Sequence, residues 1–458
     1  MSATEKFAGF VVETSFDRLP EEAIARAKNA TLDCLAVILS AVNDPIGRII
    51  IKYVKERGGV PEAGVAGGGF WTSAEMAALA NGTMSHALDY DDTGLSVGHP
   101  SICIVPTALS FGEKLGSSGK EMLEALMVGY EIEGKIGFGS TYWQAENGIH
   151  GSALFGTMGA AAVAAKLLKL DVSQVRTAFG MAASQVAGLL RNAGTMTKPL
   201  HAGNACRAGI MSALLAREGF TSDLDIIETA KGYAETFIGK GNYDEEKMVR
   251  SLGQPFHLVS HGVVVKKYPC CMLNHRALDA LFQVIEKNKI NYRQVTAVIV
   301  GVPEDIFPLR LDAHTGFEGK FCLPYNMAAA LVDGKVNLGT FTDERVQRPV
   351  IREVMSKVHL QVRKDVPIYS GSTLPARAGN PITVKLQDGR VFENQVNVPR
   401  GSPEAPLTIE ELCDKYRDCA KGVLSSEQTE QSIKLLLTLE EVKNIGQLMK
   451  TVTEKRNI

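Results

Sequence analysis

The sequence is poor in the features that mark several large classes of protein. It holds two tryptophans and a formal net charge of −2 over 458 residues, so it has neither the aromatic platforms nor the basic surface typical of nucleic-acid binding. The apolar run at 35–42 is too short to span a bilayer. The first ten residues lack the basic and apolar regions of a secretory signal. We therefore expect a cytoplasmic protein with no nucleic-acid partner and no membrane partner.

Cysteine motifs and phosphate-binding loops are also missing. The eight cysteines form no CxxC pair and show no local spacing for an iron–sulfur cluster, so we expect reduced and mostly buried thiols. The glycines at 67–69 are not followed by the GK[ST] ending of a P-loop, and those at 134–139 do not follow a strand. Turns or helix packing explain both glycine groups better than a nucleotide site.

The first part of the chain is helical in its pattern. At 458 residues the chain exceeds a single hydrophobic core, so two or three domains are expected. The segment 156–170 is rich in alanine and glycine, which predicts a helix in the middle of a tightly packed bundle. Helices are also expected at 19–41, 185–190 and 208–217. We expect an all-helical domain over residues 1–265.

After residue 258 the pattern changes to strands. The β-branched segment 295–302 and the alternating segment 358–362 predict strands, and the Asp388–Gly389 pair inside 381–398 predicts a hairpin. Thr408 and Glu411 form the pattern of a capping box, which opens a further helix. We therefore expect an α+β domain at 266–400 and a helical tail at 401–458 that returns to the first domain. The fold class is mainly α, with a smaller α+β domain.

One short segment concentrates residues that could transfer protons. Between two helical runs, residues 85–101 carry His86, Asp89, Asp91, Asp92 and His99. Acids and bases held on a loop between rigid elements are typical of general acid–base catalysis. Two alternatives stand beside this hypothesis: the aspartates cap and solvate a helix junction, or the cluster binds Mg²⁺ or Mn²⁺.

Two further segments could bind an anion. His150 precedes the small-residue helix, where unpaired N–H groups favour a carboxylate. Lys198 is followed by proline, histidine and glycine, after which we expect the next helix to start. A lysine at a helix N-terminus opposes the helix dipole unless an anion lies nearby, and Arg191 could add a second positive charge. The alternatives are a packed histidine and a solvated lysine.

The predicted domain boundary carries a third group of polar residues. Lys266 and Lys267 begin the run Lys-Lys-Tyr-Pro-Cys-Cys, and Cys271 and His275 follow. Clefts commonly form at such boundaries, so one of the two lysines is expected to point inward. Tyr325 begins a predicted helix and could reach the same cleft, although a place in the core of the smaller domain is the more common outcome for a tyrosine there.

Taken together, these segments resemble the MmgE/PrpD family. The resemblance covers the whole chain in order and is carried by five motifs. They are His86-x-x-Asp89-x-Asp-Asp-Thr93, His99-Pro-Ser, Lys198-Pro-Leu-His-Ala-Gly, Lys-Tyr-Pro-Cys-Cys before His275, and Lys320-Phe-Cys-Leu-Pro-Tyr325. The family is similar to 2-methylcitrate dehydratase, cis-aconitate decarboxylase and iminodisuccinate epimerase.

The resemblance implies a large helical domain, a smaller α+β lid domain, a site between them, homodimers, and catalysis without metal or organic cofactor. It assigns active-site positions of the decarboxylase branch to Asp89, Thr93, His99, His150, Lys198, Lys266 and Tyr325. Cys271 stands where that branch has a histidine, which argues against decarboxylation of cis-aconitate.

The residues and the resemblance lead to one functional hypothesis. Lysines, an arginine and histidines can stabilise the enolate-like charge that forms when a proton leaves a carbon next to a carboxylate. We expect a cofactor-independent hydro-lyase that acts on a small di- or tricarboxylate, with epimerisation, decarboxylation, a metal-dependent reaction and a non-catalytic scaffold as alternatives. The predicted catalytic residues are Asp89, His99, His150, Lys198, Lys266 and Tyr325, and the predicted substrate-binding residues are His86, Thr93, Arg191, Lys267, Cys271 and His275.

Overall fold

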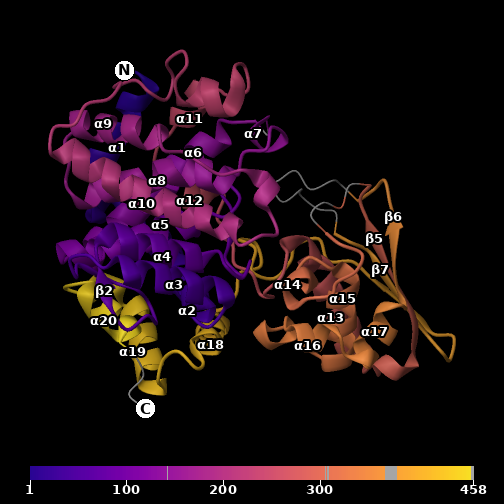
Figure 1. Ribbon diagram of the computed structural model, residues 1–458. Coiled ribbons are helices and arrows are strands. Elements are labelled where there is room, and N and C mark those ends of the chain that lie inside the picture. Colours follow the sequence, from indigo (N-terminus) through magenta and orange to yellow (C-terminus); the bar gives the residue numbers. More distant parts are fainter. Residues whose placement is uncertain (142, 305, 307–308, 367–378, 455–458) are drawn as a thin grey trace. The chain divides into compact units, whose positions relative to one another are not determined.

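The structure is a computed structural model in which two compact units are distinguished. It describes residues 1–141, 143–304, 306, 309–366 and 379–454. Unit 1 comprises Met1–Val263 and Thr408–Ile458, and unit 2 comprises Val264–Leu407. Figure 1 shows the elements of both units. The fold is mainly α, as the sequence predicts, with a smaller α+β part.

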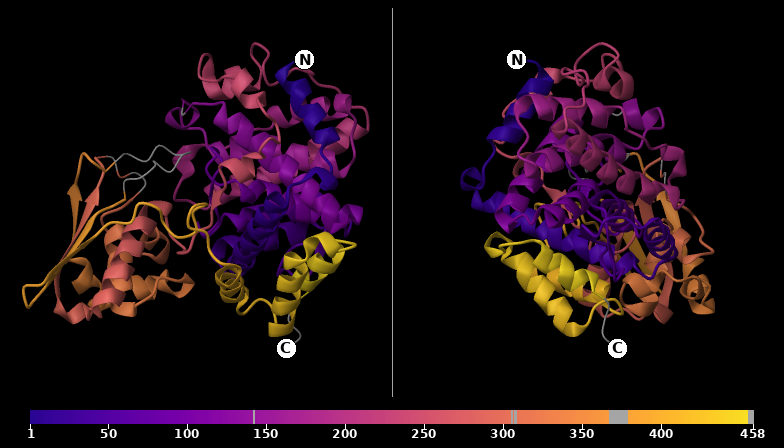
Figure 2. Two further views of the ribbon diagram at one scale, coloured as in Figure 1. Left: turned by 180° about the vertical axis from the view of Figure 1, so that it is seen from behind. Right: turned by 60° about the vertical axis from the view of Figure 1, so that its left-hand side comes forward.

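Unit 1 is a bundle of helices with a few two-residue strands. Its last three helices, which follow unit 2 in sequence, pack against α2 and α5 (Figures 1 and 2). The elements are α1 (Ala3–Glu13), α2 (Glu21–Ala41), α3 (Pro45–Arg57), β1 (Ala63–Gly64), β2 (Trp71–Thr72), α4 (Ala74–Ser85), β3 (Thr93–Gly94), α5 (Ser101–Leu115), α6 (Gly119–Phe138), α7 (Trp143–Glu146), α8 (Gly151–Leu167), α9 (Val172–Ala183), α10 (Thr197–Arg217), α11 (Glu245–Val249), α12 (His257–Ser260), α18 (Ile409–Ala420), α19 (Ser426–Leu437) and α20 (Gly446–Thr453), with β4 (Val263–Val264) at the unit boundary.

Small residues allow the central helices to approach each other closely. The alanine- and glycine-rich helix α8 is almost wholly buried and packs against α5, α6, α9 and α10, which confirms its predicted place in the bundle. A Cβ atom on Gly203 of α10 would lie 2.3 Å from the carbonyl oxygen of Leu79 in α4. Glycine at this position therefore lets the start of α10 lie beside the end of α4, where two of the predicted site segments begin.

Two helix predictions in this unit were wrong. In the segment 185–190 no α-helix forms: residues 185–189 are irregular, and Leu190 begins the 3₁₀ turn η2 (Leu190–Asn192). Helix α10 begins at Thr197 rather than after Gly203, so Lys198 lies in its first turn. Pro199 misled the prediction, because proline breaks a helix interior but is tolerated in the first turn, where its missing N–H has no intrahelical partner to lose.

Unit 2 is a four-stranded sheet with helices on one face (Figures 1 and 2). The strand order is β6-β5-β7-β8, in which β5 and β6 are parallel and the other pairs antiparallel. The predicted strands and the hairpin at 381–398 are confirmed, as is the capping box of α18. The elements are α13 (His275–Asn288), β5 (Val295–Val302), α14 (Gly316–Gly319), α15 (Leu323–Asp333), α16 (Asp343–Val346), α17 (Pro349–Met355), β6 (Val358–Val362), β7 (Ile382–Leu386) and β8 (Val391–Asn394).

The length and hydropathy of the helices bear on whether one of them could cross a bilayer. Among the described residues, no single helix has the length and apolar composition that a membrane span needs. Helices α2 and α3 pass that requirement only as a pair, and they are bent by 87° at the break between them.

Candidate active site

The aspartate loop of unit 1 is buried rather than solvated. It runs from the end of α4 at Ser85 to the start of α5 at Ser101. Asp89, Asp91 and Asp92 are 6%, 0% and 1% exposed. Burial of three acids within four positions is costly unless each has a partner, so these aspartates do not solvate the helix junction.

The backbone of this loop adopts conformations that non-glycine residues rarely take. Asp89, Leu95 and Ser96 have φ angles of 52°, 51° and 63°. Gly98, at φ 100°, lies so close to Ser152 that an added Cβ would be 2.8 Å from the serine Oγ, which accepts the N–H of the next residue, His99. Strained backbone of this kind persists only where the surrounding structure enforces it, and it is frequent at active sites.

Asp91 lies between two histidines of the same loop. One of its carboxylate oxygens is 3.0 Å from Nδ1 of His86 and 2.6 Å from Nδ1 of His99. Burial alone would raise the pKa of Asp91, but the two imidazoles outweigh burial and hold the pKa well below its usual range. An ionised carboxylate only accepts hydrogen bonds, so each Nδ1 carries a hydrogen. The second nitrogen, Nε2, is then the basic one in each neutral ring.

Two more histidines extend the cluster from other helices. His150 is the N-cap residue of α8, as predicted, and its ring stacks on His86 with centroids 5.8 Å apart. Its Nδ1 is 3.2 Å from Nδ1 of His201, which comes from α10. Gly188 leaves room for this arrangement, because a Cβ there would be 3.1 Å from His201, while its carbonyl accepts the N–H of His150. Four of the nine histidines in the chain therefore meet in unit 1.

Lys198 supplies a positive charge beside these rings. Its Nζ is 3.5 Å from a carboxylate oxygen of Asp89, so the expected misfit between a lysine and a helix N-terminus is relieved by an anion from the same chain. Both side chains are largely buried. The pair therefore joins the first turn of α10 to the aspartate loop.

Burial and Lys198 keep three of the clustered histidines neutral. Burial, followed by the charge of Lys198, lowers the pKa of His86 to about 3. The same two causes hold the pKa of His150 well below its usual range and lower the pKa of His201. These three imidazoles are therefore neutral near pH 7.

A buried network anchors the other end of the loop. Asp92 accepts hydrogen bonds from the N–H and the Oγ of Ser101, and the Ser101 hydroxyl is 2.6 Å from that of Tyr130. Burial and the nearby Asp33 raise the pKa of Asp92 to about 7. Asp92 thus contacts the start of α5 rather than the imidazoles, which gives the two adjacent aspartates different surroundings.

The predicted site residues of unit 2 form a separate group within that unit. Lys266 is buried, whereas Lys267 is exposed. Cys271 donates its N–H to the carbonyl of Lys320, and Nε2 of His275 lies 3.3 Å from the carbonyl of Cys270, the residue before Cys271. Burial raises the pKa of the Cys270 thiol, while Lys266 and Lys320 oppose that shift. Two buried lysines therefore lie near the cysteine pair.

Tyr325 is fully buried in the core of unit 2. Its hydroxyl donates a hydrogen bond to the carbonyl of Thr340, and its ring meets that of Phe341 edge to face. Within unit 2 these contacts agree with a structural place for Tyr325, the alternative that the sequence favoured.

The structure brings some of the predicted residues together and leaves others apart. His86, Asp89, His99, His150 and Lys198 form one cluster in unit 1. Thr93 is buried in the same loop, and Arg191 is an exposed residue of η2 that makes no ion pair with the described part of the cluster. Sequence reasoning placed Asp91 in the acid–histidine cluster and among possible metal ligands, but did not select it, His201 or Lys320 as a catalytic or substrate-binding residue. Each of the three lies within a motif quoted above. Its closeness in sequence to the selected acids and bases was the only signal that could have identified it.

The same residues include a set of possible metal ligands. His86, Asp91 and His99 offer ligand atoms that all lie within 4.8 Å of one another. Two imidazoles and a carboxylate suit a divalent transition metal. The distances from Nδ1 of His86 and His99 to the Asp91 oxygen are also those of hydrogen bonds to a carboxylate. The geometry is therefore compatible with a metal site as well as with a hydrogen-bonded cluster, and an experiment must distinguish them.

Comparison with protein families identifies two matching domains in the chain. The model of the MmgE/PrpD N-terminal domain matches residues 5–246, and the model of the MmgE/PrpD C-terminal domain matches residues 268–441. The chain belongs to the MmgE/PrpD family, which confirms the resemblance seen in the sequence.

Curated relatives of the chain are enzymes. Cis-aconitate decarboxylase of Mus musculus is 28% identical, over 98% of this chain and 92% of its own length. Cis-aconitate decarboxylase of Homo sapiens is also 28% identical, over 98% of this chain and 94% of its own length. A probable 2-methylcitrate dehydratase of Saccharomyces cerevisiae is 24% identical, over 80% of this chain and 75% of its own length. These similarities support an enzyme of the lyase type that acts on a small carboxylic acid.

Proposed function

We propose that the chain is a cofactor-independent lyase of the 2-methylcitrate dehydratase type, which moves a proton at a carbon next to a carboxylate of a small di- or tricarboxylic acid. One observation carries the proposal. A single oxygen of Asp91 lies 3.0 Å and 2.6 Å from Nδ1 of His86 and His99, in a buried cluster that also holds Lys198. Asp91 thereby fixes which nitrogen of each imidazole is basic, and Lys198 provides a positive charge in the same cluster.

His99 is the proposed base. A proton on a carbon next to a carboxylate is weakly acidic, so its removal needs both a base and a positive charge near the enolate-like product. Asp91 holds the Nδ1–H of His99 and leaves Nε2 as the acceptor. The side chain of His99 is 15% exposed, whereas that of His86 is fully buried. A substrate can therefore reach His99 more readily, and Lys198 is the proposed partner of the charged product.

The pair formed by His150 and His201 is the proposed acid. Dehydration breaks a C–O bond, and the departing hydroxide needs a proton. The two Nδ1 atoms are 3.2 Å apart, so one ring donates a hydrogen to the other. A proton taken up by either ring is thus shared between them. The base lies on the aspartate loop, whereas the acid pair comes from the start of α8 and from α10, which gives the substrate two distinct partners for the two proton transfers.

Decarboxylation of cis-aconitate is the second candidate. It is favoured by the two mammalian relatives, which carry that name and match 98% of this chain. In that reaction the electrons of the breaking C–C bond pass to carbon, and one proton is delivered there, so an acid is needed but no base. The base held by Asp91 would then have no step to perform, which is why dehydration is the leading proposal.

A substrate panel distinguishes the two reactions. The full chain is incubated with 2-methylcitrate, citrate and cis-aconitate, and the products are followed by ultraviolet absorbance of the new alkene and by trapping of carbon dioxide. Dehydration predicts absorbance growth from a hydroxy acid without carbon dioxide. His99→Gln, which retains a polar side chain without the basic nitrogen, is expected to abolish it. Absence of turnover with every acid of the panel would contradict the proposal.

The metal-dependent alternative has its own test. If His86, Asp91 and His99 hold a catalytic ion, the active protein contains about one equivalent of metal, and a chelator abolishes turnover. We expect turnover by metal-depleted protein to equal that of untreated protein. Recovery of activity only after a divalent metal is added back would replace the proposed mechanism.

A further inference from the structure

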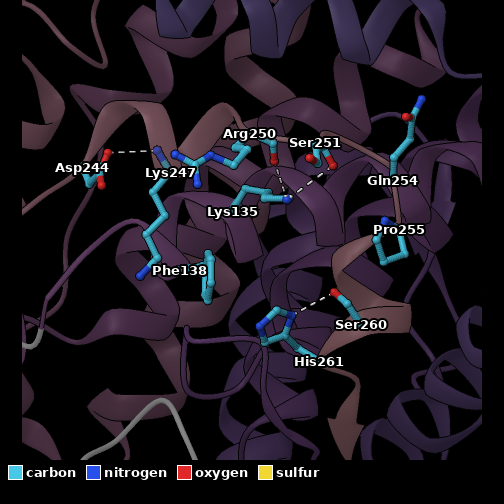
Figure 3. Close-up of a pocket in the computed structure, with 10 residues that line it drawn as sticks. All are labelled: Lys135, Phe138, Asp244, Lys247, Arg250, Ser251, Gln254, Pro255, Ser260 and His261. Atoms are coloured by element: carbon cyan, nitrogen blue, oxygen red, sulfur yellow. Dashed lines mark hydrogen bonds between the residues drawn. The ribbon is translucent and has the colours of Figure 1, made fainter.

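We propose that a second pocket in unit 1 binds a small organic anion that carries two or more negative charges. The pocket has a volume of about 450 Å³, within the range of small-molecule sites. Its walls come from the end of α6 and from the segment 244–261, and none of its lining residues belongs to the histidine cluster described above. Figure 3 shows the residues that line it.

Three cations and one carboxylate line this pocket, namely Lys135, Lys247, Arg250 and Asp244, and Lys135 is paired with Glu131 at 3.9 Å. Lys247 lies with its Nζ 4.1 Å from the ring centroid of Phe138, and no carboxylate of the described residues lies within 4.0 Å of that nitrogen. Arg250 pairs with Glu246 at 3.0 Å, but both side chains are exposed, and such a pair contributes less than about 1 kcal/mol. An incoming anion can therefore replace Glu246 at little cost. The carboxylate of Asp244 already accepts the N–H of Lys247 (Figure 3).

Two side chains of α6, Lys135 and Glu131, hold the backbone around Arg250 in place. Lys135, which is 8% exposed, donates from Nζ to the carbonyls of Arg250 and Ser251 at 2.8 and 3.4 Å (Figure 3). The carboxylate of Glu131 accepts the N–H groups of Gly253 and His257 at 2.8 and 2.5 Å. The wall is thus fixed before a ligand arrives, which reduces the entropy lost on binding.

Aromatic rings form another wall and favour a ligand with an organic body. His261 meets the ring of Phe138 edge to face at 4.9 Å and stacks on His257 at 4.0 Å. Carbon atoms of a ligand can pack on these rings while its acidic groups reach Lys247 and Arg250. Polycarboxylates and phosphate esters share this chemistry, so the ligand is identified as an organic polyanion.

The test uses the full chain with Lys198→Ala, so that binding at the histidine cluster does not obscure the result. Citrate and fructose 1,6-bisphosphate are titrated separately by calorimetry, as probes for carboxylates and for phosphate esters. We expect one equivalent of at least one probe to bind. The added double change Lys247→Gln and Arg250→Gln should weaken that binding at least tenfold. Lys240→Gln, a change of another exposed lysine, is the matched control and should have no effect.

Each outcome is decisive. Binding of citrate alone identifies a carboxylate site, binding of the bisphosphate alone identifies a phosphate-ester site, and binding of both supports recognition by charge. If neither probe binds at millimolar concentration, or if the double variant binds as well as the Lys240→Gln control, the proposal is overturned. Turnover is measured separately on the wild-type chain, so failure of this proposal and failure of the proposed lyase activity are distinguishable.

Discussion

Replacement of Asp91 by asparagine is the sharpest test of the proposed mechanism. Asparagine has nearly the shape of aspartate but carries one oxygen and one NH₂ group. Its oxygen can still accept Nδ1–H from one histidine, whereas its NH₂ group can only donate to the other. One of the two imidazoles must therefore lose its hydrogen bond or change its tautomer, so that the basic nitrogen no longer faces the substrate.

The expected loss follows from the two distances at Asp91. Both contacts, 3.0 and 2.6 Å to Nδ1 of His86 and His99, join a carboxylate to a donor. Hydrogen bonds to charged groups contribute about 1.5–3 kcal/mol each. Loss of one of them would remove about 1.5–3 kcal/mol, and each 1.36 kcal/mol corresponds to a factor of ten in rate. We therefore expect kcat to fall by about 10- to 100-fold in Asp91→Asn.

The assay is the pH profile of kcat/KM for the substrate that the panel identifies. A carboxylate raises the pKa of an imidazole that it contacts, and Asp91 contacts the proposed base His99, so its replacement is expected to move the acid limb to lower pH. Asp92→Asn is the matched control, because it removes an adjacent buried carboxylate that contacts Ser101. A similar loss of kcat in both variants, with unchanged pH profiles, would refute the reasoning.

Three further predictions concern charge, protonation and packing. Lys198→Met should lower kcat/KM about 10- to 100-fold and move its alkaline limb to higher pH, because Lys198 lowers the pKa of the proposed acid His150. His86 has a pKa of about 3 when folded and about 6.5 when unfolded. The unfolded state therefore binds more protons between these values, and the free energy of unfolding should drop by about 2 kcal/mol from pH 7 to pH 5 through His86 alone. Denaturant titrations at pH 7 and pH 5 measure this drop in the free energy of unfolding. The drop due to His86 should remain in His314→Gln, which changes an exposed histidine, and should be missing in His86→Gln. Gly203→Ala should destabilise unit 1 by about 1–3 kcal/mol, whereas Gly9→Ala, with nothing within 4 Å of the new Cβ, should not destabilise it.

Local signals explain which parts of the fold were predictable. The hairpin needs only a turn pair between two alternating runs, and the capping box of α18 needs only Thr408 and Glu411. The start of α10 depended on whether Pro199 interrupts or begins a helix, and both are compatible with its geometry. The contact of Gly203 with α4 decided that question, and such a contact is not visible in the sequence around α10.

The candidate site shows the same division. His86 and His99 were singled out because acids and histidines are concentrated around them. The role of Asp91, by contrast, depends on both rings turning toward one of its oxygens, and Asp92 has an identical side chain but contacts Ser101. His201 became recognisable only when α8 and α10 brought it to His150. Residue types predicted the chemistry, while the choice between adjacent residues required the packing.

The electrostatics of the cluster also indicate why the substrate should be an anion. Without a ligand, burial and Lys198 hold the pKa of His150 well below its usual range, so the ring is neutral and cannot act as an acid near pH 7. A di- or tricarboxylate bound beside it adds negative charge, which raises the pKa of a neighbouring imidazole. The same anion competes with Asp89 for Lys198, whose present contact of 3.5 Å is a loose one. Substrate binding would thus let His150 take up from solvent the proton that dehydration requires, and an uncharged analogue should not be converted.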